Sequence, residues 1–115
     1  MHPYKRSERL GELILAEISD LVVRDLKDPR LGFLTFTRVE LSDDLRHAKI
    51  FVSMLGSEPE KARTLQGLAS ATGYIRRHLG RMLRLRYTPE LTFLIDESME
   101  HGAKIAQLLR QLHVE

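Results

Sequence analysis

The chain has 115 residues, of which 43% are hydrophobic and 30% are charged, as in an ordinary globular domain. It contains no cysteine, which excludes disulfides, thiolate zinc sites and cysteine nucleophiles. The formal net charge is +2, and the sequence holds neither a transmembrane span nor a secretory signal, so we expect a single cytoplasmic domain over residues 1–115.

The first predicted element is an amphipathic helix over residues 7–27, which ends before Pro29. Its apolar residues recur at spacings of three and four, which predicts one buried stripe. These residues are Leu10, Leu13, Ile14, Ile18, Leu21, Val22 and Leu26. Lys5, Arg6 and Arg9 lie at the start of this helix, where the helix dipole disfavours positive charge unless an anion binds there.

Two predicted strands follow, over residues 32–41 and 46–54. Both are rich in β-branched and aromatic residues, and the second alternates, with Ala48, Ile50, Val52 and Met54 on one face. The short polar connection Ser42-Asp43-Asp44 predicts that the two strands form an antiparallel hairpin.

The second half of the chain predicts three helices and a third strand. Ser57 begins a helix and forms a capping box with Glu60. The apolar face of this helix consists of Ala62, Leu65, Leu68 and Ala69. Because Gly67 and Gly73 disfavour one straight helix, we expect a kink or break between Ala69 and Gly73, followed by a helix over residues 74–84.

A strand over residues 91–95 and a final helix, capped by Asp96 or Ser98, complete the predicted elements. The buried line of the final helix is expected to be Ile105, Leu108, Leu109 and Leu112. The resulting order predicts an α+β fold in which a three-stranded sheet is covered by helices.

The main functional signal is a set of arginines on the third predicted helix. Residues 61–86 include seven Lys or Arg and no Asp or Glu, which leaves eleven basic and sixteen acidic residues elsewhere, a net charge of −5. At 100° per residue, Arg76, Arg77, Arg81 and Arg84 share one arc about 140° wide, and no acid four residues away neutralises them. Since guanidinium groups make bidentate contacts with phosphate, the arc predicts binding to a nucleic-acid backbone with little readout of bases.

Other chemistry has little support in the sequence. The five histidines lack the spacing of metal ligands, and we expect them to be solvated or hairpin residues. No phosphate loop, dinucleotide fingerprint or nucleophile elbow is present. Tyr4, Tyr74 and Tyr87 are candidates for stacking on bases. We expect no catalytic residue, metal or cofactor.

Several stretches carry a resemblance to a known family. They are KRSERLGELI, LSDDLRHAKIFVS, ATGYIRRHLGRMLRLRYTPELTFLID and ESMEHGAKIAQLL. Together they make the chain similar, essentially end to end, to bacterial ribosome-binding factor A, and RMLRLRYTPELTF is the most specific piece.

This resemblance implies a type-II KH-like RNA-binding domain with the order α-β-β-α-(kink)-α-β and a C-terminal helix. It also implies a non-enzymatic factor that binds the immature 30S subunit and assists late maturation of 16S rRNA, including its 5′ end, notably in the cold. Ordinary KH domains clamp a nucleic-acid backbone with a GxxG loop, which this chain lacks. The family has an Ala-x-Gly kink instead, which matches Ala71, Thr72 and Gly73 here and favours docking on folded rRNA.

The resemblance transfers the rRNA-binding role to Arg76, Arg77, Arg81 and Arg84. Lys5, Arg6 and Arg9 form a second contact set, and Arg46, His47 and Lys49 a weaker one. A monomer with no membrane or small-molecule ligand is expected. Two alternatives stay open: a protein-interaction module that uses the apolar face of the first helix, and a hydrolase acting on RNA ends with His47 or His78 as the base.

Overall fold

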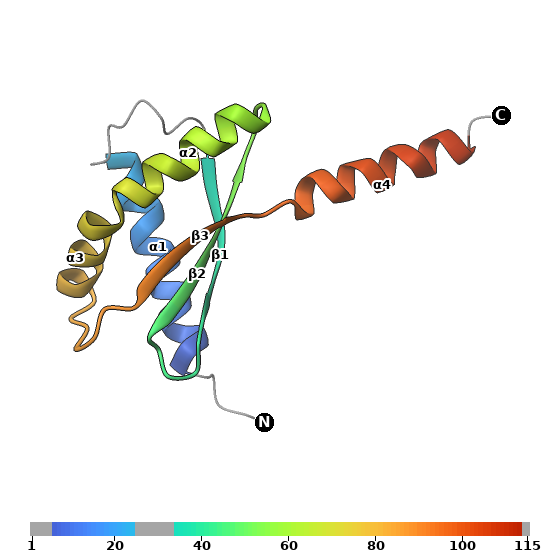
Figure 1. Cartoon of the computed structure of the whole chain (residues 1–115). Helices are drawn as coiled ribbons and strands as arrows, with labels where there is room; N and C mark the ends of the chain where they lie inside the picture. Colours follow the sequence, from blue (N-terminus) through green and yellow to red (C-terminus); the bar gives the residue numbers. More distant parts are fainter. Residues whose placement is uncertain (1–5, 25–33, 114–115) are drawn as a thin grey trace, which may run out of the picture.

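The computed structural model describes residues 6–24 and 34–113, which form four helices and a three-stranded sheet (Figure 1). The elements are α1 (Arg6–Arg24), β1 (Leu34–Leu41), β2 (His47–Met54), α2 (Glu58–Ser70), α3 (Thr72–Met82), β3 (Glu90–Ile95) and α4 (Ser98–His113). This confirms the α+β class and the predicted order. The predicted end of the first helix and the start of the first strand lie outside the described residues.

The sheet has the order β1-β2-β3, with β2 in the centre (Figure 1). β1 and β2 pair antiparallel, as the hairpin pattern predicts, and their register shifts at a bulge between Phe36 and Arg38. β3 pairs with the other edge of β2 in parallel, with His47 opposite Glu90. Because parallel strands need a long crossover, the helices α2 and α3 serve as the connection between β2 and β3.

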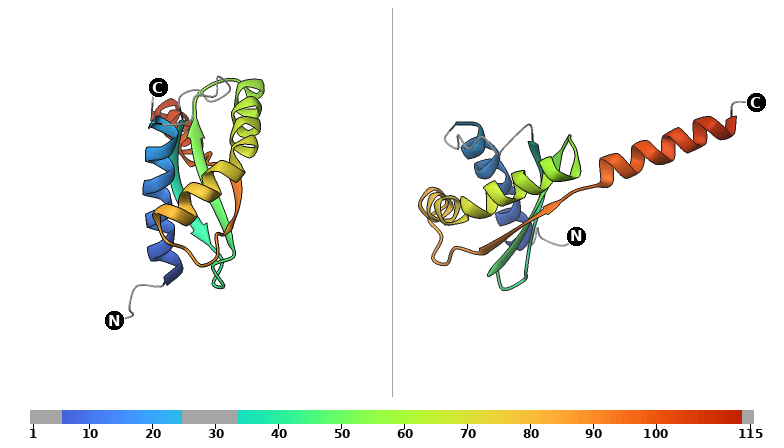
Figure 2. Two further views of the ribbon diagram at one scale, coloured as in Figure 1. Left: turned by 90° about the vertical axis from the view of Figure 1, so that its left-hand side faces the viewer. Right: turned by 45° about the horizontal axis from the view of Figure 1, so that its top comes forward.

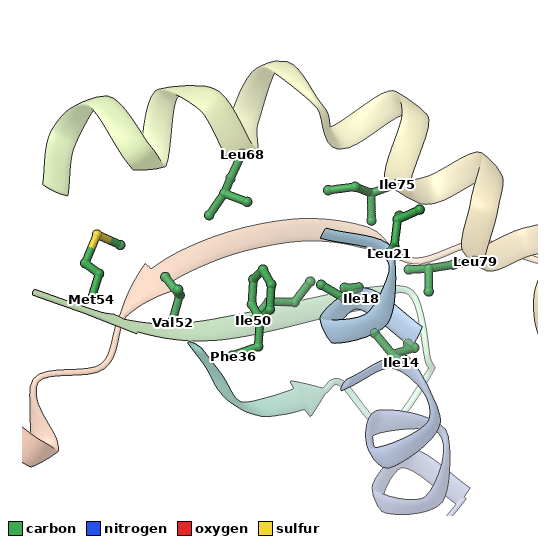
Figure 3. Close-up of a cluster of buried hydrophobic side chains, with 10 residues drawn as sticks. All are labelled: Ile14, Ile18, Leu21, Phe36, Ile50, Val52, Met54, Leu68, Ile75 and Leu79. Atoms are coloured by element: carbon green, nitrogen blue, oxygen red, sulfur yellow. The ribbon is translucent and has the colours of Figure 1, made fainter. Parts of the chain in front are cut away.

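The core lies between one face of the sheet and the helices α1, α2 and α3 (Figures 2 and 3). The predicted inner face of β2 and most of the predicted stripe of α1 contribute to it, although Leu13 of that stripe is exposed. Leu68, Ile75 and Leu79 complete it from α2 and α3. Ile14, Ile18, Leu21, Ile50, Val52, Leu68, Ile75 and Leu79 are all fully buried. Because this side of α3 is buried, the opposite side of the helix faces the solvent.

Two glycines allow close contacts that shape the molecule. A Cβ atom on Gly11 of α1 would lie 3.0 Å from the carbonyl oxygen of Val39, so glycine lets α1 pack directly against β1. A Cβ atom on Gly80 of α3 would lie 2.9 Å from Oγ1 of Thr88. A side chain at position 80 would therefore clash with Thr88 unless that residue shifted.

The predicted apolar face of α2 is only partly correct. Ala62 and Ala69 are exposed, whereas Lys61 and Thr64 are buried together with Leu68. The buried face of α2 is therefore not the purely apolar face. It includes Lys61, which is only 4% exposed. Lys61 therefore does not belong to the exposed cationic surface.

The predicted buried line of the last helix is wrong. α4 extends away from the rest of the protein (Figure 1), and Ile105, Leu108, Leu109 and Leu112 are all exposed. Helices thus cover one face of the sheet, and these helices are α1, α2 and α3. Within the described ranges, no helix combines the length and apolar character that crossing a membrane requires.

Candidate nucleic-acid interface

The break between α2 and α3 falls at Ala71, inside the predicted interval 69–73. The N–H of Ala71 donates to the carbonyl oxygens of Gly67 and Leu68, both at 3.1 Å, and the Thr72 hydroxyl also donates to that of Leu68. The chain therefore changes direction while its backbone groups remain hydrogen-bonded. A Cβ atom on Gly73 would meet no other atom within 4 Å, so the surrounding structure leaves space for a side chain there.

Arg77 and Arg81 lie on the exposed side of α3, away from the buried Ile75 and Leu79. With Tyr74, they line a shallow groove of about 390 Å³ beside Thr88, which we call the α3 groove. Among the residues that the structure describes, no carboxylate forms an ion pair with either arginine. Both guanidinium groups are therefore free to bind an anion.

Arg76 differs from the prediction that it binds rRNA together with Arg77, Arg81 and Arg84. Its Nε donates to the carbonyl oxygen of Pro89, and its Nη2 donates to that of Thr88, both at 2.9 Å. The side chain is only partly exposed and ties α3 to the segment before β3. Its guanidinium is engaged by the protein's own backbone, which gives Arg76 a structural role.

Arg84 also differs from its predicted position, because α3 ends at Met82. Its φ of 51° lies in the left-handed region, which few residues other than glycine adopt. The N–H of Leu85 donates to the carbonyl oxygen of Gly80 at 3.0 Å, and the N–H of Arg84 donates to that of Arg81 at 3.4 Å. These bonds form a Schellman motif, in which glycine is the usual residue at the position of Arg84.

The chain after this motif forms a second groove with the start of α1 and the turn of the hairpin. The groove has a volume of about 480 Å³, and we call it the α1 groove. Its basic residues are Arg6, Arg9, Arg84 and Arg86, and Tyr87 is its aromatic residue. The structure thus brings Arg84 together with the predicted contact set on the first helix. Lys5, the remaining member of that set, lies outside the described residues.

One carboxylate, that of Asp44, also lines the α1 groove. Its Oδ1 accepts hydrogen bonds from the Ser42 hydroxyl at 2.6 Å and from the N–H of Arg46 at 3.0 Å. These two bonds, chiefly the one from Ser42, hold the pKa of Asp44 below its usual value. Asp44 is therefore a turn-forming residue, and none of the four groove arginines pairs with it or with another carboxylate of the described chain.

The sequence profile of ribosome-binding factor A matches residues 6–109. The chain belongs to the ribosome-binding factor A family. A ribosome-binding factor A from Halothermothrix orenii is 52% identical over 111 residues, which cover 96% of this chain and 91% of the relative.

One solved structure and one fitted homology model from the ribosome-binding factor A family support the same relationship. The solution NMR structure of a Thermotoga maritima protein assigned to the family has a TM-score of 0.74 and 38% identity, and the match covers 85% of this chain and 93% of that one. A homology model of the Thermus thermophilus factor, fitted into a cryo-electron-microscopy map of a 30S complex, has a TM-score of 0.66 and 27% identity. That match covers 79% of this chain and 96% of the other.

The structure also bears on the two alternatives to a ribosome-binding factor A function. Of the α1 stripe that a protein-interaction module would use, Ile14, Ile18 and Leu21 are buried in the core, whereas Leu13 is exposed. His78 is 7% exposed, and its Nε2 lies 3.2 Å from the carboxylate of Glu17 on α1. The prediction of a solvated His78 is therefore wrong, because α3 packs this side chain against α1. In the described part of the chain, no group of His, Asp or Glu could hold a metal ion.

Two features of this surface are not apparent from the sequence. Arg86 belongs to the basic stretch of residues 61–86 but lies outside the predicted arc of arginines. Only the charge of that stretch indicated that Arg86 could bind an anion. The guanidinium carbon of Arg46 lies 5.4 Å from the centre of the Tyr87 ring, in a third groove of about 230 Å³. Arg46 and Tyr87 are distant in sequence, and only the fold brings them together.

Proposed function

We propose that this chain binds the immature small ribosomal subunit through its α3 and α1 grooves and assists late maturation of 16S rRNA, including its 5′ end, without catalysing a reaction. The observation that carries this proposal is the set of arginines without carboxylate partners among the described residues. They are Arg6, Arg9, Arg77, Arg81, Arg84 and Arg86. Family membership supports it, as does the fit of the similar Thermus thermophilus factor into the map of a 30S complex.

Such a surface binds RNA by neutralising phosphates and releasing their counterions. If about five to seven phosphates are engaged, the logarithm of the affinity should fall against that of the salt concentration with a slope of about −4 to −6. A binding protein shifts an equilibrium only towards the state that it binds better. We propose that the factor acts as a cytoplasmic monomer and stabilises the arrangement of the precursor rRNA that fits both grooves. Such binding needs neither nucleotide nor metal.

The test is co-sedimentation of the purified full chain with small ribosomal subunits over a range of salt concentrations. The double variant Arg77→Glu and Arg81→Glu should no longer associate, while its far-UV circular dichroism and urea unfolding stay unchanged. Arg63→Glu with Arg110→Glu is the matched control, because it changes the net charge equally at exposed positions outside both grooves. Normal sedimentation of the first variant, or equal loss in the control, would refute the proposal.

A further inference from the structure

Tyr87 is an exposed aromatic residue that phosphate binding alone does not explain. Its side chain is 66% exposed, and it lines both the α1 groove and the smaller groove that contains Arg46. Tyr87 therefore lies where two grooves that contain arginines meet. An exposed ring in this position is suited to stack on a planar group.

The protein itself occupies one side of this ring. The guanidinium carbon of Arg46 lies 5.4 Å from the ring centre, within the range of a cation–π interaction. Arg46 lines the smaller groove and not the α1 groove. The contact thus lies on the side of the smaller groove, and the Tyr87 side chain still remains 66% exposed.

The remaining lining of the α1 groove matches the parts of a nucleotide. Leu10, Leu13, Leu45 and Leu85 form its apolar walls, and the four arginines supply donors for phosphate oxygens. Its volume of about 480 Å³ lies within the range of about 300–1,000 Å³ that is usual for small-ligand sites. Oδ1 of Asp44, its one carboxylate, already accepts two hydrogen bonds from the turn.

We propose that the α1 groove holds one unpaired nucleotide of the rRNA, with its base stacked on Tyr87 and its neighbouring phosphates bound by the groove arginines. This inference rests on the proposed function and deepens it. The α3 groove supplies affinity for the backbone, and the α1 groove selects a place where a nucleotide leaves its helix. Because every base has a π face, the selection concerns RNA shape and not sequence.

The experiment compares Tyr87→Leu with Tyr87→Phe in the full chain, using purified small subunits and a salt series. Stacking on an aromatic side chain contributes enough that Tyr87→Leu should weaken binding between about five-fold and a hundred-fold. Tyr87→Phe keeps the ring and should bind like the unaltered chain. The salt slope of Tyr87→Leu should stay unchanged, because no phosphate contact is lost, whereas Arg86→Gln should make the slope shallower by about 0.7–0.9.

Two results would overturn the inference. If Tyr87→Leu binds as tightly as the unaltered chain, no base stacks on the ring. If the variant binds more weakly and its salt slope also becomes shallower, Tyr87 only positions the arginines. Either result leaves the proposed function intact as long as the reversal of Arg77 and Arg81 abolishes association, so the two failures can be told apart.

Discussion

Arg76 on α3 is hydrogen-bonded to the backbone of Pro89, whose carbonyl oxygen lies 2.9 Å from the arginine Nε. The adjacent carbonyl of Thr88 accepts a second bond from the same guanidinium, and Pro89 is fully buried. This pair of bonds fixes the chain where it enters β3. It therefore sets the position of Tyr87, between the grooves, relative to the arginines of α3.

Replacing Arg76 with alanine should lower the free energy of unfolding by about 1–3 kcal/mol, because two backbone carbonyl groups lose a charged donor. Arg77→Ala removes the same side chain from an exposed neighbouring position and should change it by less than about 0.5 kcal/mol. Urea unfolding followed by circular dichroism measures both values. Identical unfolding midpoints would show that the bonds of Arg76 contribute nothing to stability.

Replacing Arg84 with glycine should stabilise the fold and weaken binding at the same time. The left-handed backbone at φ 51° costs an ordinary residue about 1 kcal/mol that glycine avoids, so the free energy of unfolding should rise by about that amount. Loss of the guanidinium should make the salt slope of subunit binding shallower by about 0.7–0.9. Urea unfolding and salt-dependent co-sedimentation measure the two effects.

Arg84→Ala is the matched control for this prediction, since alanine removes the charge but keeps the strained backbone. It should bind as weakly as Arg84→Gly without the gain in stability. A glycine variant that is no more stable than the alanine variant would show that the backbone at position 84 is unstrained.

Asp96 should make stability depend on pH in the acidic range. The Thr37 hydroxyl donates to its Oδ2 at 2.6 Å and the N–H of Ser98 donates to its Oδ1 at 2.9 Å, which lowers the pKa of Asp96 to about 2 from a usual value of 3.8. The folded state thus binds fewer protons than the unfolded state between these values. The stabilisation is complete above about pH 4 and is lost as the pH falls towards 2.

Asp96→Asn tests this dependence. The variant should be less stable than the unaltered chain at pH 6, and the difference between them should shrink as the pH approaches 2. Urea unfolding at several pH values gives the comparison. A difference that stays constant over this range would mean that the ionised carboxylate of Asp96 is not the stabilising group.

Periodic patterns in the sequence correctly predicted the buried faces of the elements that pack into the core, such as α1 and β2. The spacing of Ile14, Ile18 and Leu21 and the alternation from Ala48 to Met54 follow from the geometry of a helix and a strand, and both sets are buried as predicted. The same kind of pattern gave a wrong prediction of burial for α4. A stripe of leucines identifies one face of a helix, but it does not show whether another element covers that face. The stripe is exposed here.

The sequence predicted where the candidate site lies, but it did not predict which groups its arginines contact. Helical geometry placed Arg76 and Arg77 side by side, yet one is bonded to the backbone near β3 and the other is exposed. The carbonyl groups that distinguish them approach α3 only when the following segment folds back past Gly80. Likewise, the meeting of Arg9 with Arg84 depends on the packing of α1, which no local pattern encodes.

The parallel pairing of β2 with β3 also sets when this surface can exist during synthesis. α1, the hairpin and the arginines of α3 leave the translating ribosome before residues 90–95 do. Before that last strand pairs with β2, we expect Thr88, Pro89 and Tyr87 not to be held in place, so that neither groove is formed. A chain cut short before residue 90 would keep the arginines of α3 but would lack the strand pairing on which both grooves depend.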